Sequence, residues 1–178
     1  MFEGLEDDVR AAPTQRGTVR LIVRRPAVDE REVVSEARLD VDEGVIGDTW
    51  RMRGSSSTPD GSAHPEAQIT VMSARAAEAF GGDVERWPLA GDQLYVDYDI
   101  SEENLPAGAR VRIGEAEVEV SAKPHTGCAK FSGRFGKDAL RLVSTPTGQS
   151  LRLRGMNARV TKGGTVRVGD RIESVRSL

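Results

Sequence analysis

Cysteine and histidine are scarce in this sequence, which contains one cysteine, Cys128, and two histidines, His64 and His125. A single cysteine excludes an intrachain disulfide framework and any zinc or iron–sulfur site built from several cysteines of one chain. Two histidines argue against a structural zinc site in the same way. Whatever chemistry the protein performs must therefore depend on few side chains.

Long apolar runs and an excess of positive charge are also missing. No window approaches the roughly 18 apolar residues that span a bilayer, and residues 1–8 are acidic where a secretory signal is basic. The 25 Lys and Arg residues against 28 Asp and Glu residues give a net charge of −3, with both signs interspersed. A nucleic-acid-binding protein usually has a basic excess or stripe. We therefore expect a cytoplasmic protein with neither a membrane nor a nucleic acid as its partner.

The length of 178 residues suits one domain of ordinary size. Residues 1–16 are polar, and we expect them to form a flexible N-terminal segment outside the core. Residues 17–178 would then form a single domain. Within it, residues 53–66 contain almost nothing that could be buried, and their Gly, Ser and Pro content predicts a long loop.

Alternating β-branched and polar residues predict many short strands. In the first, at residues 18–24, Val19, Leu21 and Val23 would share one face. Two strands joined by the two-residue turn at 114–115 would form a hairpin. The strands after the first are expected at 32–41, 68–72, 93–97, 109–113, 116–121, 151–153, 157–161 and 167–174.

Two helices are expected between the strands. Ser73 is a good N-cap for the alanine-rich segment 74–80. Apolar residues spaced by three and four predict a second helix at 131–143. Many short strands with about two helices are typical of a mainly β protein with a closed or nearly closed β-barrel and helices packed outside it.

The surroundings of Cys128 are the most informative part of the sequence for chemistry. A thiol at the start of a helix among basic side chains favours the thiolate, which is a nucleophile and a ligand for soft metals. Gly127 permits close approach of the backbone. The alternative is a small buried apolar cysteine. The basic neighbours are Lys123, His125, Lys130 and Arg134.

Three further features have a functional and a plain structural interpretation. His125 can act as a general base, a ligand, or a polar turn residue. Asp48 follows two glycines and can face a ligand or only shape a turn. Arg152, Arg154 and Asn157 can recognise a phosphate or the edge of a heterocycle, or belong to a strand with a solvated basic face.

The order of several segments resembles that of a MOSC domain, the domain found at the C-terminus of molybdenum cofactor sulfurases and as stand-alone bacterial proteins. The lone cysteine lies at the expected place among these segments. The resemblance covers roughly residues 17–175. Its segments are 17–19, 44–48, 68–71, 89–94, 105–114 and 164–170.

The resemblance implies a barrel of the pyruvate-kinase type that binds the molybdenum cofactor, molybdopterin. Cys128 would ligate molybdenum or carry a persulfide, and thiolate is a suitable soft donor. Relatives often have proline before the cysteine, where this chain has Gly127, and histidine after the aspartate, where it has Thr49 and Trp50. The cofactor-binding candidates are Asp48, His125, Gly127, Lys130, Arg134 and Asn157.

Three functions are compatible with these residues. The leading one is a molybdoenzyme that reduces N-hydroxylated or N-oxide-like small molecules, with a partner reductase supplying electrons. The second is sulfur transfer through a Cys128 persulfide. The third is a non-catalytic ligand- or partner-binding module. Full-length sulfurases hold pyridoxal phosphate in a separate desulfurase domain; that domain is absent here, so we do not expect covalent pyridoxal phosphate.

Overall fold

Seven strands of the computed structural model, which describes residues 1–175, close into a barrel. Around the barrel the order is β1-β11-β7-β8-β9-β5-β6, and β1 pairs with β11 to complete the circle. The barrel pairs are antiparallel except β5 with β6. This closure confirms the predicted fold class. The seven strands are β1 (Arg16–Arg24), β5 (Ile69–Ser73), β6 (Leu94–Asp97), β7 (Arg110–Ile113), β8 (Ala116–Val120), β9 (Met156–Lys162) and β11 (Arg171–Ser174).

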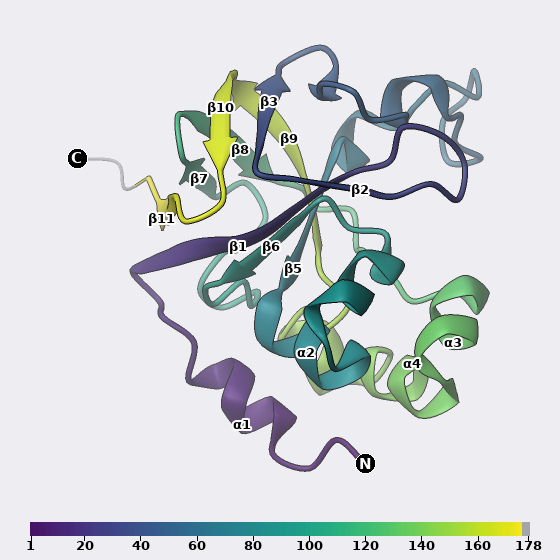
Figure 1. The fold of residues 1–178 in the computed structure, drawn as a ribbon, viewed down its shortest axis with the longest axis vertical. Coiled ribbons are helices and arrows are strands. Elements are labelled where there is room, and N and C mark those ends of the chain that lie inside the picture. Colours follow the sequence, from purple (N-terminus) through teal and green to yellow (C-terminus); the bar gives the residue numbers. More distant parts are fainter. Residues whose placement is uncertain (176–178) are drawn as a thin grey trace.

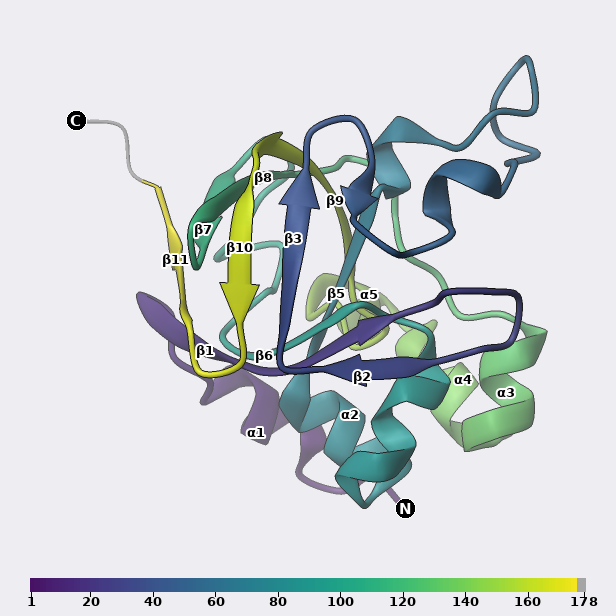
Figure 2. The same ribbon diagram turned by 45° about the horizontal axis from the view of Figure 1, so that its top comes forward.

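Four further strands of the described residues lie beside the barrel. β2 (Glu32–Val34) extends the barrel sheet from the end of β1. A separate small sheet has the order β10 (Gly164–Arg167), β3 (Glu36–Asp40), β4 (Gly44–Val45), and it runs alongside the barrel in Figure 2. The predicted strand at 32–41 is therefore divided into β2 and β3, and the predicted strand at 167–174 contains β11 and only the last residue of β10.

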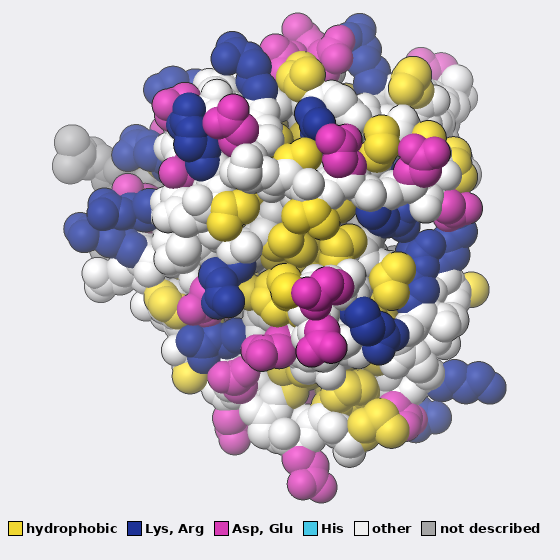
Figure 3. Space-filling model, viewed as in Figure 1, with side chains coloured by type: hydrophobic (Ala, Val, Ile, Leu, Met, Phe, Trp, Pro, Cys, Tyr) yellow, Lys and Arg dark blue, Asp and Glu magenta, His cyan; other side chains and the backbone are white. Residues whose placement is uncertain are grey.

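Apolar side chains form two cores, one on each side of the barrel wall. The first fills the barrel interior and the space under the small sheet, with residues such as Ile22, Leu39 and Val118. The second lies between the barrel and the helices, which gather at one end of the molecule (Figure 1). Acidic and basic side chains are interspersed on the face of the molecule that Figure 3 shows.

A β-bulge decides which side chains of β1 enter each core. The register against β6 shifts between Val19 and Leu21, and an extra residue reverses the alternation of faces. Val19 and Ile22 therefore point into the barrel, whereas Leu21 and Val23 contact the helices. The expectation that Val19, Leu21 and Val23 share one face is wrong, because the bulge lies between them.

The N-terminal residues join the second core. Helix α1 (Leu5–Arg10) buries Leu5 and Val9, which are four residues apart and so share a helix face. Ala12 is buried as well. The expectation that residues 1–16 lie outside the core is wrong, because this short apolar stripe gives the segment a face to bury.

Helix α2 (Ala74–Gly81) follows β5 as predicted. The Ser73 side chain accepts a hydrogen bond from the Ala76 amide at 3.3 Å, which confirms its role as N-cap. Three 3₁₀ segments belong to the connections between strands. They are η1 (Trp50–Met52), η2 (Pro65–Ala67) and η3 (Val84–Ala90).

The second predicted helix is interrupted. Residues 129–143 form α3 (Ala129–Phe135) and α4 (Lys137–Val143), and the chain leaves the helical region at Gly136, where φ is 98°. After α5 (Pro146–Ser150), residues 151–154 form a turn. The predicted strand at 151–153 is therefore wrong, because Arg152 has a left-handed φ of 52° that no strand accommodates.

No helix in the described residues has the length and apolarity that a bilayer crossing requires.

Candidate functional site

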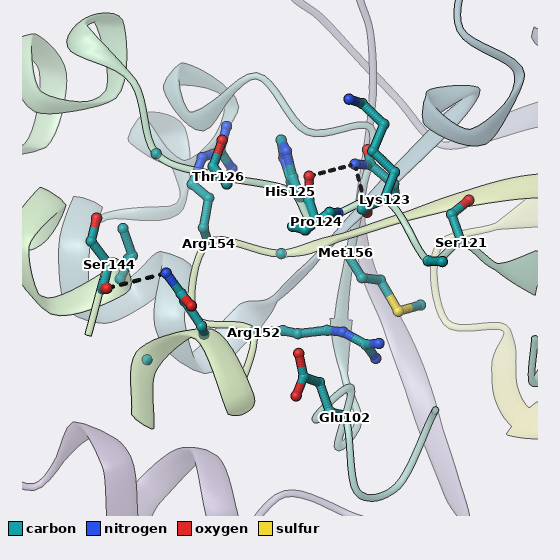
Figure 4. Close-up of a pocket in the computed structure, with 17 residues that line it drawn as sticks. Glu102, Ser121, Lys123, Pro124, His125, Thr126, Ser144, Arg152, Arg154 and Met156 are labelled. Atoms are coloured by element: carbon teal, nitrogen blue, oxygen red, sulfur yellow. Dashed lines mark hydrogen bonds between the residues drawn. The ribbon is translucent and has the colours of Figure 1, made fainter. Parts of the chain in front are cut away.

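The connection from β8 to α3, residues 121–128, separates two cavities. The first has a volume of about 250 Å³ and the second about 360 Å³. Both are lined by Lys123, Pro124, His125 and Thr126, which therefore form a shared wall. Figure 4 shows these four residues along one side of the first cavity, with Arg152 and Glu102 at its other end.

Asn157 holds this wall in place from β9. Its Nδ2 donates to the carbonyl oxygens of Lys123 and Pro124, both at 3.3 Å. The backbone carbonyl oxygen of Asn157 accepts a hydrogen bond from the Ser121 backbone amide at 3.0 Å. The residue is buried beneath the wall and lines both cavities. The structure thus brings Asn157 together with His125, as expected of two residues of one site.

A buried carboxylate connects the shared wall to a buried arginine. Asp92 is fully enclosed; its Oδ1 lies 2.7 Å from His125 Nε2, and its Oδ2 accepts from Arg154 Nη1 at 2.6 Å. Burial alone would raise the pKa of Asp92, but the charge of Arg154 and the contact with His125 outweigh it and lower that pKa to about 2. Asp92 is therefore an anion that only accepts hydrogen bonds.

The surroundings of His125 favour its neutral form. Burial and the charge of Arg154 lower its pKa below the usual range, although Asp92 acts in the opposite direction. A neutral imidazole that contacts a carboxylate through Nε2 must carry its proton on that atom. Nδ1 is then unprotonated.

Arginine side chains supply most of the positive charge in the first cavity. Arg154 is 9% exposed at its side chain, donates through Nη2 to Ala90 O at 2.8 Å, and stacks over the Phe131 ring at 5.0 Å. Its Nε is buried and has no partner among the described residues. Arg152 donates to the Leu105 carbonyl at 2.6 Å, and burial lowers its pKa. The solvated basic strand face is thus ruled out for these two residues.

The second cavity has its own arginine and aspartate pair. Asp48 is fully enclosed at its side chain, and Arg25 binds it through Nε at 2.9 Å and Nη2 at 2.8 Å. The amides of Arg25 and Trp50 also donate to this carboxylate. Burial would raise the pKa of Asp48, but its bonds with Arg25 lower it. Asp48 therefore supports Arg25 from behind, and Arg25, not Asp48, lines the cavity.

Cys128 lies at the N-terminal end of α3 and is exposed. The alternative of a buried apolar cysteine is therefore wrong. Gly127, the residue before it, lines the first cavity, whereas Cys128 lies just outside the lining of both. Gly127 also packs closely on α4, since a Cβ there would lie 2.6 Å from Leu140 Cδ1. This contact explains why a residue without a side chain precedes the cysteine.

Lys130 and Arg134 turn away from the two cavities. Lys130 Nζ lies 3.6 Å from Asp29 Oδ1, and Arg134 Nη2 lies 3.7 Å from the same atom. Arg134 also donates to the Leu89 carbonyl at 2.9 Å. Neither residue lines a cavity. The structure does not bring them together with His125, Gly127 and Asn157.

Two site residues received no role in the sequence analysis, Asp92 and Arg25. Asp92 lies in the segment 89–94 that carried part of the resemblance, but its partners are 33 and 62 residues away. Arg25 lies 23 residues from Asp48. The pairing of strands that are distant in sequence, in the order β9-β5-β6-β1, and the loops at their ends bring these residues together, so no local pattern could have paired them.

The fold and the site define a β-barrel protein with an arginine-lined double cavity beside an exposed thiol. The MOSC domain model matches residues 58–173, which is more than half of the chain. The chain therefore belongs to the MOSC domain family, which is associated with the molybdenum cofactor. No curated protein matches the chain.

Solved structures show the same fold. The YuaD protein from Bacillus subtilis has a TM-score of 0.64 at 16% identity, with 90% of this chain and 97% of that chain covered. YiiM from Escherichia coli has a TM-score of 0.58 at 21% identity, with 90% of this chain and 71% of that chain covered. YiiM from Geobacillus stearothermophilus has a TM-score of 0.59 at 15% identity, with 90% of this chain and 75% of that chain covered. At these identities the likeness concerns the fold.

Proposed function

We propose that this protein binds the molybdenum cofactor and reduces N-hydroxylated or N-oxide-like small molecules, with Cys128 as the protein ligand of molybdenum. One observation carries the proposal: the exposed cysteine directly follows a wall that is shared by two arginine-lined cavities. A thiolate is a soft metal ligand, and the guanidinium groups of arginine match phosphate geometry.

The chemistry of the first cavity fits such a cofactor. Arg152 and Lys123 offer donors to a phosphate, and the buried Nε of Arg154 has no partner among residues 1–175. Pro124, Val143 and Met156 offer apolar surface to a flat ring system. The residues present are thus those that an anionic heterocycle requires.

The side chains around the wall would bind and orient. Arg152 and Lys123 would hold the phosphate, Asn157 would keep the wall in position, and the thiolate of Cys128 would fix the metal at the mouth. Molybdenum, when bound, supplies a centre that exchanges electrons. The reduction breaks an N–O bond with two electrons and two protons and yields the amine and water, and an electron-donor reductase would supply the electrons.

Metal analysis tests the proposal. The protein would be produced in cells that make the cofactor, and its molybdenum content would be measured for the wild type, Cys128→Ala and Cys128→Ser. We expect molybdenum in the wild type and a loss of most of it in Cys128→Ala. Lys130→Ala is the matched control, because Lys130 is close in sequence but faces Asp29. Equal metal content in wild type and Cys128→Ala would remove the role assigned to Cys128.

A second candidate function is sulfur transfer by a Cys128 persulfide. It is favoured by the exposure of the thiol, since a carrier must present its sulfur to other proteins. Incubation with a cysteine desulfurase should then add one sulfur atom, about 32 Da, to Cys128. Absence of this adduct in mass spectra would reject the sulfur-transfer function. A non-catalytic binding module would become the first choice if Cys128 were fully buried and had no cavity beside it. Cys128 is exposed, and Gly127 next to it lines the first cavity.

A further inference from the structure

The wall shared by the two cavities carries a hydrogen-bond acceptor among charged donors. Lys123, Arg152 and Arg154 line the first cavity and can only donate, whereas the carboxylate of Glu102 lines its other end. His125 differs because its two ring nitrogens have different surroundings. Nε2 is engaged by Asp92 at 2.7 Å, whereas Nδ1 has no hydrogen-bond partner in the described part of the chain.

Asp92 decides which form of the ring faces the cavities. The charged groups that act on His125 are Asp92, Arg154 and the more distant Arg25. Arg154 disfavours an imidazolium, and the enclosed carboxylate of Asp92 can only accept. The proton of the neutral ring is therefore fixed on Nε2, and the lone pair of Nδ1 is left unused.

The free nitrogen is within reach of a bound molecule. The His125 side chain is 18% exposed and lines both cavities. A fixed acceptor at this position favours a ligand with a matching donor over an analogue that lacks it.

We infer that Nδ1 of His125 is the acceptor that selects ligands carrying an N–H or O–H donor, and that Asp92 is the positioning residue that keeps it in this form. The inference rests on the proposed function, because an N-hydroxylated compound carries such a hydroxyl group and its O-methyl ether does not. His125 is thus a specificity-determining residue for the substrates of this site.

Two substitutions separate the acceptor from the bond to Asp92. In His125→Gln the side-chain amide nitrogen can take the place of Nε2 and still donate to Asp92, but nothing replaces Nδ1. In His125→Asn a polar group remains near Nδ1 and the contact with Asp92 is lost. Lys130→Ala is the matched control, because Lys130 faces Asp29 and lines neither cavity.

The test measures binding of acetophenone oxime and of its O-methyl ether to protein purified from cells that make the cofactor. We expect the wild type to prefer the oxime roughly tenfold, the ratio that one hydrogen bond supplies. His125→Gln should bind both probes equally, whereas Lys130→Ala should keep the wild-type ratio. An unchanged ratio in His125→Gln, or no preference in the wild type, overturns the inference.

Nitrogen NMR of the histidine ring gives a second readout that needs neither cofactor nor activity. The measurement is made at pH 7.5, about one unit above the ordinary histidine pKa. We expect the His125 ring of the wild type to carry one proton, on Nε2. A proton on Nδ1 overturns the inference. The molybdenum content of the same preparations reports on the proposed function separately. If the protein contains no molybdenum but still prefers the oxime, the molybdoenzyme function is rejected and the role of His125 is supported.

Discussion

Two enclosed aspartates support the two cavities, and they are satisfied in different ways. Asp48 is bound by the Arg25 side chain and by two backbone amides near it. Asp92 is bound only by side chains, those of Arg154 and His125, and both of these line the first cavity. The amides tie Asp48 to the local turn, whereas Asp92 joins only groups that face the cavity.

The difference separates a structural carboxylate from one that prepares a site. Removal of Asp48 would leave Arg25 with its hydrogen bond to the Gly91 carbonyl at 3.1 Å, in a turn that is only half-buried. Removal of Asp92 would leave a buried guanidinium without its anion and a histidine without its fixed proton position. The comparison therefore predicts unequal losses of stability and a functional effect for Asp92.

The largest effect is expected for Asp92→Ala. Breaking a buried ion pair by removing one partner costs about 3–5 kcal/mol, because the other charge is left uncompensated. The free energy of unfolding, measured by urea denaturation, should fall by that amount. Since replacing both charges by apolar groups is often nearly neutral, the double variant Asp92→Ala/Arg154→Met should recover much of the loss. No recovery would show that Arg154 is not the source of the cost.

Asp48→Ala should cost less, about 2 kcal/mol, the scale of a lost hydrogen bond to a charged group. Asp48 belongs to a half-buried turn, so water can solvate the groups that it leaves, whereas Asp92 is fully buried. The same denaturation experiment compares the two variants directly. A loss equal to or larger than that of Asp92→Ala would contradict the distinction between the two aspartates.

The sequence predicted most of the barrel. The alternation at 109–113 and 116–121 predicts a hairpin, and the structure confirms it as β7 and β8. Ser73 and the alanines after it predict α2, because capping and helix propensity are local. The face of Leu21 could not be predicted in this way, since a bulge depends on the partner strand.

The candidate site was predicted less completely. Cys128, Gly127 and His125 are adjacent in sequence, and the structure keeps them adjacent around the shared wall. Asp92 and Arg25 reach it only through strand pairing, so periodicity contains no trace of their role. Lys130 was chosen for its closeness in sequence to Cys128, but the helical turn directs it to Asp29.

Acid should reveal the same asymmetry. The pKa of Asp92 is about 2 in the folded protein against an ordinary value of 3.8. A lowered folded-state pKa stabilises the fold above the ordinary value, by about 2 kcal/mol for this shift. That stability should be lost as the pH falls from about 4 to 2.

The pKa of His125 is also lowered in the fold, so its contribution is lost in the same direction, below its ordinary value of 6.5. Urea unfolding between pH 5 and pH 2 should give a steeper loss for wild type than for Asp92→Asn, which has no carboxylate to protonate at that position. Parallel curves would mean that Asp92 is not held as a stabilised anion.

The smallest effect is expected at an exposed carboxylate, Asp29, which faces Lys130 and Arg134 at 3.6 and 3.7 Å. Exposed pairs contribute less than about 1 kcal/mol because water and salt screen them. Asp29→Asn should therefore leave the free energy of unfolding almost unchanged, and Lys130→Ala should leave the molybdenum content at the wild-type level. A loss of metal in Lys130→Ala would show that Lys130 belongs to the cofactor-binding site. It would also show that a charged residue outside the two cavities can contribute to metal binding.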